Sequence, residues 1–255
     1  MPWTVLRVSI VMPAYNERPR IAKAVSRALD AGSKAGLDTE VVVVDDGSND
    51  GTGDEIEAAG ESDGRVRLVR YKVNMGKGYA VKRGVEAATG DYVVLMDSDG
   101  EIDPGELRRY VRGLGSSDVC VGSKWHPESR VQTPVIRRLL SLTFYLLVRL
   151  LTNIPCSDTQ AGMKAFRRDA LLRIVRLQLV KKYAFDVELL AVASLLKLRI
   201  REMPVKIMLG SGFSFKEIMR MLVDLMGIVY RLRLIRWYQQ NLKIQEPKYR
   251  PIIRI

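Results

Sequence analysis

Short apolar runs alternate with segments of helical spacing through the first half of this 255-residue chain. The runs that predict strands are residues 6–15 (LRVSIVMPAY), 39–46 (TEVVVVDD), 66–71 (VRLVRY) and 91–97 (DYVVLMD). The segments that predict helices are residues 20–32, a turn with a short helix over 47–59, and 77–88. This alternation predicts an α/β fold, with a mostly parallel sheet and helices on both of its faces.

The second half of the chain is less regular and ends in amphipathic helices. Residues 118–125 and 200–207 predict strands, and the helices are predicted over residues 134–152, 164–175, 185–197 and 215–240. Neither internal repeats nor a clear linker interrupts this pattern. We therefore predict one sheet domain over residues 1–210 and a basic, amphipathic helical extension over residues 211–255 that faces a membrane.

Positive charge is concentrated towards the end of the chain. The formal net charge is +12, and from residue 195 onwards 13 Lys and Arg stand against 4 Asp and Glu. Such an excess predicts an anionic partner, which could be nucleic acid, a membrane surface or a phosphorylated substrate. The best candidate for a membrane span, LLSLTFYLLV between Arg138 and Arg149, has ten residues. A span needs about 20 apolar residues, so none is expected.

Processing and redox signals favour the cytoplasm. The N-terminus has no basic and apolar leader with a small-residue cleavage site, so secretion is not expected. Cys120 and Cys156 sit in apolar sequence, which favours buried reduced thiols over a disulfide. His126, the sole histidine, cannot anchor a zinc site by itself. We expect a protein that is peripheral on the cytoplasmic face of a membrane.

Acidic residues follow three of the predicted strands, where the sequence reads PAYNE (13–17), DDGS (45–48) and DSDGE (97–101). Because ligands bind beyond the carboxyl ends of parallel strands, we interpret the three acidic ends as one site. Asp97 and Asp99 stand two residues apart, so on an extended strand end they share a face. Two such carboxylates suit a hard cation, Mg²⁺ or Mn²⁺. The alternative is a solvated turn of Asp and Gly.

The usual phosphate-binding loops are absent after the first strand. Neither G-x-x-x-x-G-K-[ST] nor G-x-G-x-x-G occurs there, so a P-loop or dinucleotide-binding protein is not favoured. A Gly-rich and basic stretch, NMGKG, instead follows the third strand. Asn74 and Lys77 in this stretch are candidates for contact with a phosphate or donor, or else solvated residues of a first helical turn.

Four separated motifs, taken together and in order, resemble family 2 glycosyltransferases. They are VSIVMPAYNE, VVVVDDGSNDGT, NMGKGYAVKRGVEAATGDYVVLMDSDG and DTQAGMKAFRRDAL. The narrower resemblance is to polyprenyl-phosphate (dolichyl-phosphate) hexosyltransferases, and NMGKG, DTQAGMK and YAFDVELL look more like the glucosyl-transferring branch than the mannosyl-transferring one. The resemblance implies a GT-A (Rossmann-like) fold. It also implies transfer of a hexose from a nucleotide-sugar, UDP-glucose or GDP-mannose, to polyprenyl phosphate.

The resemblance also implies roles for residues on the donor side. Pro13, Tyr15 and Glu17 would lie against the nucleoside, and Asp46 would bind the base or the ribose. Asp97 and Asp99, with Ser98 between them, would form the metal motif that bridges to the diphosphate and carries catalysis. Glu101 stands where mannosyl relatives often have a Gln that also binds the metal.

On the acceptor side the resemblance is looser. Lys124 in GSKW and Arg137 before RLLS fall where relatives place basic residues near donor or acceptor phosphate, and each could equally be a surface cation. Many relatives have an Arg and a Gly-Ser-Lys stretch after MPVKI, and MLGSGFSFKE follows that pattern only in part. Relatives often carry membrane anchors or spans, and none is recognised in this chain.

The acceptor decides whether the reaction needs a general base. A sugar hydroxyl has a high pKa and requires a carboxylate base, whereas a phosphate monoester has a second pKa of about 6 and needs only orientation and desolvation. A single displacement inverts the anomeric carbon, so an α-linked donor gives a β-linked product. If a base is used, Asp158 in DTQAG is the candidate; the alternative is a helix cap or an acceptor-positioning residue.

Two basic helical segments, residues 137–151 and 218–240, predict contact with a membrane surface. Their apolar faces are bordered by Arg, a pattern typical of helices that lie among lipid headgroups. The alternative for both is ordinary packing against the sheet with a solvated basic edge.

Three other functions remain open. The chain could be a soluble family 2 transferase acting on a polysaccharide or glycan hydroxyl, a nucleotidyltransferase, or a basic nucleic-acid-binding protein. PAYNERPR lacks the glycines of a nucleotidyltransferase phosphate loop. The acidic strand ends would repel a nucleic acid, and stacking motifs are missing, so no nucleic acid partner is expected.

Overall fold

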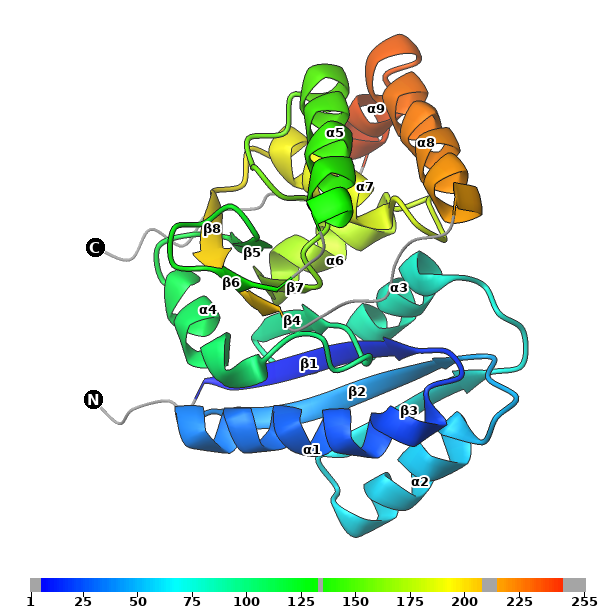
Figure 1. The fold of residues 1–255 in the computed structure, drawn as a ribbon, viewed down its shortest axis with the longest axis vertical. Helices are drawn as coiled ribbons and strands as arrows, with labels where there is room; N and C mark the ends of the chain where they lie inside the picture. The colour runs from blue at the N-terminus through cyan, green and yellow to red at the C-terminus, as the bar shows by residue number, and fades with distance from the viewer. Residues whose placement is uncertain (1–5, 133–134, 208–214, 245–255) are drawn as a thin grey trace.

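The computed structural model describes residues 6–132, 135–207 and 215–244, and it contains a seven-stranded sheet in the order β3-β2-β1-β4-β7-β5-β8 (Figure 1). The strands of this sheet are β1 (Arg7–Ala14), β2 (Asp38–Asp46), β3 (Val66–Tyr71), β4 (Tyr92–Met96), β5 (Val119–Ser123), β7 (Met163–Arg167) and β8 (Ile200–Pro204). A separate pair of short strands is formed by β6 (Arg130–Val131) and β9 (Lys206–Ile207).

The α-helices surround the sheet (Figure 1). They are α1 (Arg18–Ala35), α2 (Thr52–Ser62), α3 (Lys77–Ala87), α4 (Leu107–Gly113), α5 (Val135–Thr152), α6 (Arg168–Arg176), α7 (Phe185–Leu195), α8 (Phe215–Val229) and α9 (Trp237–Ile244). A 3₁₀ turn, Pro104–Glu106, precedes α4, and a π-helical segment, Tyr230–Leu234, follows α8.

The sheet is mostly parallel, as predicted. β1 pairs in parallel with β2 and β4, and β2 pairs in parallel with β3. β7 runs antiparallel between β4 and β5, and β8 is parallel to β5. Parallel neighbours need crossover connections, which the helices between the first four strands supply. The carboxyl ends of β1, β2 and β4 therefore meet at one edge of the sheet.

Helices cover both faces of the sheet, with α1, α2 and α4 on one side and α3, α6 and α7 on the other (Figure 1). The continuous apolar run in β2 follows from this double cover, because successive side chains point to opposite faces. Val41 and Val43 pack into the core beneath α1, whereas Val42 packs into the core beneath α3. The predicted α/β fold with helices on both faces is thus confirmed.

One predicted helix is wrong at its beginning. Residues 164–167 form most of strand β7, and the helix α6 begins only at Arg168. Lys164 is the misleading residue, since a lysine is rarely found in a central strand. Here it is 1% exposed and its Nζ lies 2.6 Å from Asp186 Oδ1, so a tertiary ion pair compensates for its burial.

The long helix predicted over residues 215–240 is broken. It consists of α8, the π-helical segment and α9, with Arg236 at a φ of 50° before α9. A non-glycine residue in this left-handed region ends an α-helix, because its Cβ crowds the backbone. The break directs Tyr238 into the core, where its hydroxyl donates to Glu188 of α7.

α8 and the segment after it share a core with the sheet domain. Leu225, Ile228, Leu232 and Tyr238 belong to the same buried cluster as α7. The predicted boundary at residue 210 lies outside the described residues and stays a prediction. Cys120 and Cys156 are both buried and free, in agreement with the prediction of reduced thiols.

The helices α5 and α8 stand next to each other on the side of the sheet away from α1 (Figure 1). Both carry large apolar side chains that are exposed: Leu140, Leu142, Leu146 and Leu150 on α5, and Met219, Val223 and Met226 on α8. Within the described ranges, no helix combines the length and the apolar character that crossing a bilayer demands.

Candidate active site

A cavity of 940 Å³ opens at the carboxyl ends of β1, β2 and β4, and residues of α5 and α8 contribute to its wall. Most of the residues predicted for the site line it: Pro13, Tyr15, Glu17, Asp46, Asn74, Lys77, Asp97, Ser98, Asp99, Glu101 and Lys124. Asp158 does not line it, and the side chain of Arg137 lies outside what the structure describes. The topology thus brings the three acidic strand ends together.

Asp46, at the end of β2, organises the loop before α3. Its Oδ1 accepts hydrogen bonds from the Tyr71 hydroxyl at 2.7 Å and from the Met75 N–H at 2.8 Å, and its Oδ2 accepts from the Gly76 N–H at 2.9 Å. Gly76 has a φ of 101°, and a Cβ there would come within 2.5 Å of the Lys181 carbonyl oxygen. This loop places Lys77 at the cavity.

The carboxylates that follow β4 are held close together by a tight turn. Ser98 donates its hydroxyl to the Pro13 carbonyl at 2.9 Å, which ties the ends of β1 and β4. Burial raises the pKa of Asp99 to about 6, and the charges of Asp97 and Glu101 add to this, although the Glu101 N–H and Lys77 act in the opposite direction. A cation placed here would relieve the repulsion.

Lys77 supplies one positive charge to this cluster. Its Nζ lies 2.7 Å from Asp97 Oδ1. Although burial opposes its charge, the carboxylates of Asp97 and Asp186 raise the pKa of Lys77 above its ordinary value. Lys77 therefore stays protonated beside the acids at physiological pH.

Asp186 is a lining residue that the sequence interpretation did not assign. It stands in the first turn of α7 and pairs with the buried Lys164, while burial raises the pKa of its carboxyl against the opposing effects of Lys164 and Lys77. A signal was present in the sequence, because Asp186 stands between Phe185 and Val187 in a helix whose other residues, apart from Glu188 and Ser194, are apolar. An acid in that place needs a partner or a ligand.

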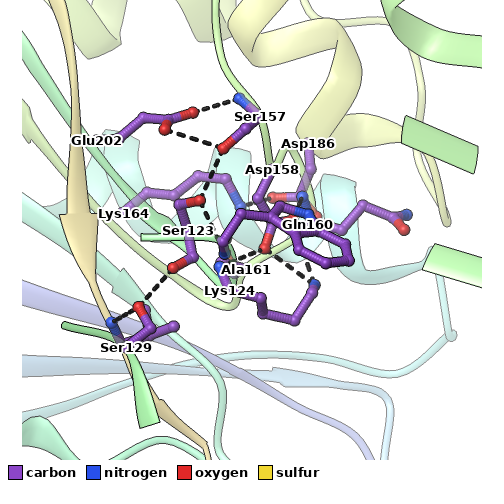
Figure 2. A network of polar contacts seen from close by, with 12 residues as sticks. Ser123, Lys124, Ser129, Ser157, Asp158, Gln160, Ala161, Lys164, Asp186 and Glu202 are labelled. Carbon is purple, nitrogen blue, oxygen red and sulfur yellow. Dashed lines mark hydrogen bonds and ion pairs between the residues drawn. The ribbon is translucent and has the colours of Figure 1, made fainter. Parts of the chain in front are cut away.

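Asp158 is held by donors on several sides (Figure 2). Its carboxylate accepts the N–H groups of Lys124 and Gln160, each at 3.0 Å, and lies 3.0 Å from Lys124 Nζ. Being 5% exposed and outside the cavity lining, it has the contacts of a positioning residue. This geometry favours the second of the two roles considered for Asp158, and its use as a base stays an untested prediction.

A polar network fixes the segment that carries Asp158 (Figure 2). Ser157 donates both its N–H and its hydroxyl to Glu202 of β8, and its Oγ lies 2.8 Å from Ser123 Oγ at the end of β5. Ser129 in turn donates its hydroxyl to the Ser123 carbonyl. These hydrogen bonds hold the end of β5, from which Lys124 reaches the cavity.

The carboxylates fit a metal site that is completed by the substrate better than one formed by protein ligands alone. Within the described part of the chain, no three Asp, Glu, His or Cys side chains are arranged to hold an ion by themselves. Mg²⁺ typically binds one or two carboxylates and completes its shell with waters and substrate phosphates. Asp97 and Asp99 meet that requirement, since both face a cavity large enough for a nucleotide-sugar.

Other lining residues come from α5, α8 and the segment before α7, and of these only Tyr183 lies in a quoted motif, YAFDVELL. Ser141 of α5, Lys182 and Tyr183 before α7, and Arg220 and Met221 of α8 all line the cavity. Sequence reasoning did not single out these residues, because only tertiary packing brings them to the site.

The chain is similar to known proteins in both sequence and fold. Residues 9–175 match the family model "Glycosyl transferase family 2". The dolichyl-phosphate beta-glucosyltransferase ALG5D of Trichomonas vaginalis is 31% identical over 245 residues, which cover 90% of this chain and 75% of that protein. The dolichyl-phosphate beta-glucosyltransferase of Homo sapiens is 33% identical over 215 residues, with coverages of 78% and 66%.

Among solved structures, glucosyl-3-phosphoglycerate synthase from Mycobacterium tuberculosis, in complex with Mn²⁺, UDP and glucosyl-3-phosphoglycerate, superposes with a TM-score of 0.65. The two chains are 21% identical, and the match covers 88% of this chain and 79% of that one. At this identity the likeness concerns the fold.

Proposed function

The chain belongs to glycosyltransferase family 2, and on that premise we propose that it transfers glucose from UDP-glucose to a polyprenyl phosphate with inversion at the anomeric carbon. The relatives named above are glucosyltransferases, in agreement with the predicted resemblance to the glucosyl-transferring branch. The observation that carries the proposal is the cavity, whose lining combines clustered carboxylates with residues of the amphipathic helices α5 and α8.

The donor would lie along the strand ends. Pro13, Tyr15 and Glu17 form one rim of the cavity, and Tyr15 is 48% exposed, so its ring is available to a nucleoside. The carboxylate of Asp46 accepts two N–H groups of the loop before α3, so we assign it a positioning role as well as the predicted contact with base or ribose. The UDP bound by the structural neighbour supports a uridine donor.

The diphosphate would lie at Asp97 and Asp99. A divalent cation held there, Mg²⁺ or Mn²⁺, would act as a Lewis acid that neutralises charge on the leaving diphosphate. The Mn²⁺ in the neighbour's complex supports this assignment. Glu101 stays a candidate third ligand, and Ser98 holds the turn in place through Pro13. Lys77 adds a fixed positive charge at the same point.

A phosphate acceptor removes the need for a general base. Its second pKa is about 6, so it is already a nucleophile at neutral pH and needs only to be oriented in a site from which water is excluded. The structure supports this choice, because Asp158 is occupied by the donors of Lys124 and Gln160 and does not itself line the cavity. Lys124, which lines the cavity, and Arg137 stay candidates for contact with phosphate.

The apolar chain of the acceptor would enter from the side of α5 and α8. Leu150 and Val223, on these two helices, are 76% and 69% exposed, and Arg149 and Arg220 on the same helices are exposed too. Helices of this kind gain free energy by lying among lipid headgroups, especially anionic ones. These helices support a peripheral position at a membrane surface, and the cytoplasmic face stays part of the proposal.

One observation favours a second candidate, transfer to a glycan hydroxyl. Asp186 lines the cavity and burial raises its pKa, as a carboxylate base would require. Its pairing with Lys164 weakens this alternative, because the same carboxylate is needed to compensate a buried charge.

The proposal is tested by incubation of the protein with radiolabelled UDP-glucose or GDP-mannose, polyprenyl phosphate and Mg²⁺ or Mn²⁺. The expected result is glucose label that extracts into organic solvent and is released by mild acid, and chelator should abolish it. Label that appears only on an added glycan, or no lipid label with any donor, would overturn the proposal.

A further inference from the structure

The cavity holds positive charge beyond the residues assigned so far. Its lining includes four cations, Lys77, Lys124, Lys182 and Arg220. The first two are neutralised, since Lys77 pairs with Asp97 at 2.7 Å and Lys124 pairs with Asp158 at 3.0 Å. Among the residues that the structure describes, Lys182 and Arg220 have no ion pair or hydrogen bond from their side chains. These two charges are therefore available to a ligand.

Lys182 and Arg220 reach the cavity from different elements, and one carboxylate joins those elements. Arg220 lies on α8, and Asp224, one turn further along the same helix, accepts the N–H of Tyr183 at 3.2 Å and that of Ala184 at 3.4 Å. These N–H groups belong to the segment that carries Lys182, immediately before α7. Asp224 thus holds Lys182 and Arg220 against the same cavity.

The surroundings of this pair include apolar side chains. The lining also contains Ser141 of α5 and the apolar Met221, which follows Arg220 on α8, while Lys182 stands beside the loop before α3, since a Cβ on Gly76 would lie 2.7 Å from its Cγ. An anion with an apolar tail fits such surroundings, because the helices α5 and α8 expose apolar side chains beyond the cavity. A nucleoside diphosphate has no such tail.

We propose that Lys182 and Arg220 form a phosphate-binding subsite for the acceptor, and that Asp224 is the positioning residue that holds it together. The inference rests on the proposed function and extends it, because it assigns the acceptor phosphate to residues on the wall made by α8. Two unpaired cations on separate elements suit a dianion, since each can donate hydrogen bonds to a different phosphate oxygen.

The test measures binding of farnesyl phosphate, a short-chain phosphate monoester, by calorimetry without lipid vesicles. The double variant Lys182→Gln/Arg220→Gln should weaken binding about tenfold or more, a loss of about 1.4 kcal/mol. The matched control, Arg176→Gln/Lys181→Gln, also removes one Arg and one Lys charge, but from residues that do not line the cavity. Binding of farnesyl phosphate to it should stay within about twofold of the parent protein. Farnesol, which lacks the phosphate, should not distinguish the variants.

The positioning role of Asp224 is tested by comparing the KM for the acceptor with the KM for the donor, because a general loss of structure would change both. Asp224→Ala should raise the KM for polyprenyl phosphate while the KM for the donor stays unchanged, and Asp224→Asn should restore most of the loss because an amide oxygen also accepts N–H donors. Inorganic phosphate should compete with farnesyl phosphate in the parent protein and not in the double variant.

Equal weakening in the double variant and in its matched control would overturn the subsite, because general electrostatics would then explain the loss. Unchanged farnesyl phosphate binding in the double variant, or weakened UDP binding instead, would overturn it too. The function is judged separately, by label transfer in the parent protein. If transfer fails while the binding pattern holds, the subsite stands and the proposed reaction is wrong. If transfer succeeds without the binding pattern, the proposed reaction stands and the subsite is wrong.

Discussion

At the scale of single residues, the site is an arrangement of acids with unequal compensation. Asp97 has Lys77 beside it, and Asp186 has Lys164, but Asp99 is largely buried, and burial together with the charges of Asp97 and Glu101 raises its pKa to about 6. Repulsion of this kind is retained in proteins where a ligand removes it. The proposed cation and the diphosphate it accompanies would complete the balance of charge.

Removal of either metal-motif carboxylate tests this balance. Asp97→Ala and Asp99→Ala should each lower glucosyl transfer by about 10³-fold, because stabilisation of the leaving group is the largest electrostatic contribution to such reactions. Both should also lose the Mn²⁺-dependent part of UDP binding, measured by calorimetry. Glu57→Ala on the exposed face of α2 is the matched control, and transfer by that variant should be unchanged. Full activity of Asp99→Ala in the presence of chelator would contradict the metal assignment.

The ion pair of Lys164 and Asp186 makes a prediction about stability. Asp186→Asn leaves Lys164, 1% exposed, without its counter-charge, so the free energy of unfolding in urea should fall by about 3 kcal/mol. Lys164→Met combined with Asp186→Asn should recover most of this loss, since no charge is then buried alone. A double variant that is as unstable as the sum of its single changes would show that the two side chains are not coupled.

At the scale of elements, single side chains join strands that are far apart in sequence. Glu40 of β2 accepts the Ser9 hydroxyl of β1 at 2.5 Å, the Thr89 N–H and hydroxyl at 2.7 Å each, and an N–H of Arg67 of β3 at 3.3 Å. Burial of Glu40 opposes its ionisation, but these hydrogen bonds outweigh that effect and lower its pKa to about 2.

The lowered pKa of Glu40 predicts a pH dependence of stability. A carboxyl with a depressed pKa in the folded protein stabilises it at every pH above the ordinary value of 4.5, and this contribution is lost as the pH falls towards 2. Glu40→Gln should therefore lower the free energy of unfolding by about 2 kcal/mol at pH 7, after allowance for solvent screening. The difference from the parent protein should shrink between pH 4.5 and pH 2, and a difference independent of pH would contradict the assignment.

The exposed apolar surfaces of α5 and α8 predict membrane affinity. Leu150→Glu combined with Val223→Glu should lower partitioning onto vesicles with anionic lipid by about tenfold or more, because burial of one such side chain contributes about 1.5–3 kcal/mol. Flotation of the protein with vesicles measures this, and circular dichroism checks that the variant is folded. The control is Leu6→Glu, which places the same substitution at an exposed apolar residue just before β1, away from the two helices. An equal loss of partitioning in both variants would contradict the assignment of α5 and α8 to the membrane interface.

At the scale of the whole molecule, the cavity is built from two kinds of sequence. Its acidic side comes from strand ends, where a parallel sheet obliges the residues after β1, β2 and β4 to meet, so those residues could be predicted from their motifs. Its other wall comes from α5, α8 and the segment before α7, which carry no local signal of their place. Lys182 and Arg220 could not be assigned to the site without the packing that brings them there, whereas Asp186 had a local signal, an acid within an apolar stretch.

The same limit explains the errors in the predicted elements. Lys164 gives β7 the appearance of a helix surface, and only its tertiary pair with Asp186 allows it to stand in a central strand. The break at Arg236 goes together with the hydrogen bond from Tyr238 to Glu188, a contact between residues far apart in the chain. The short helix α4 was not predicted because its seven residues give too few apolar repeats for a periodicity.

The most direct measurement is a crystal structure of the protein with UDP and Mn²⁺, in which anomalous scattering locates the metal. We predict Mn²⁺ about 2 Å from a carboxylate oxygen of Asp97 or Asp99, with its remaining ligands drawn from the diphosphate and water. A metal bound away from both carboxylates, or a nucleotide lodged outside the cavity at the ends of β1, β2 and β4, would contradict the account.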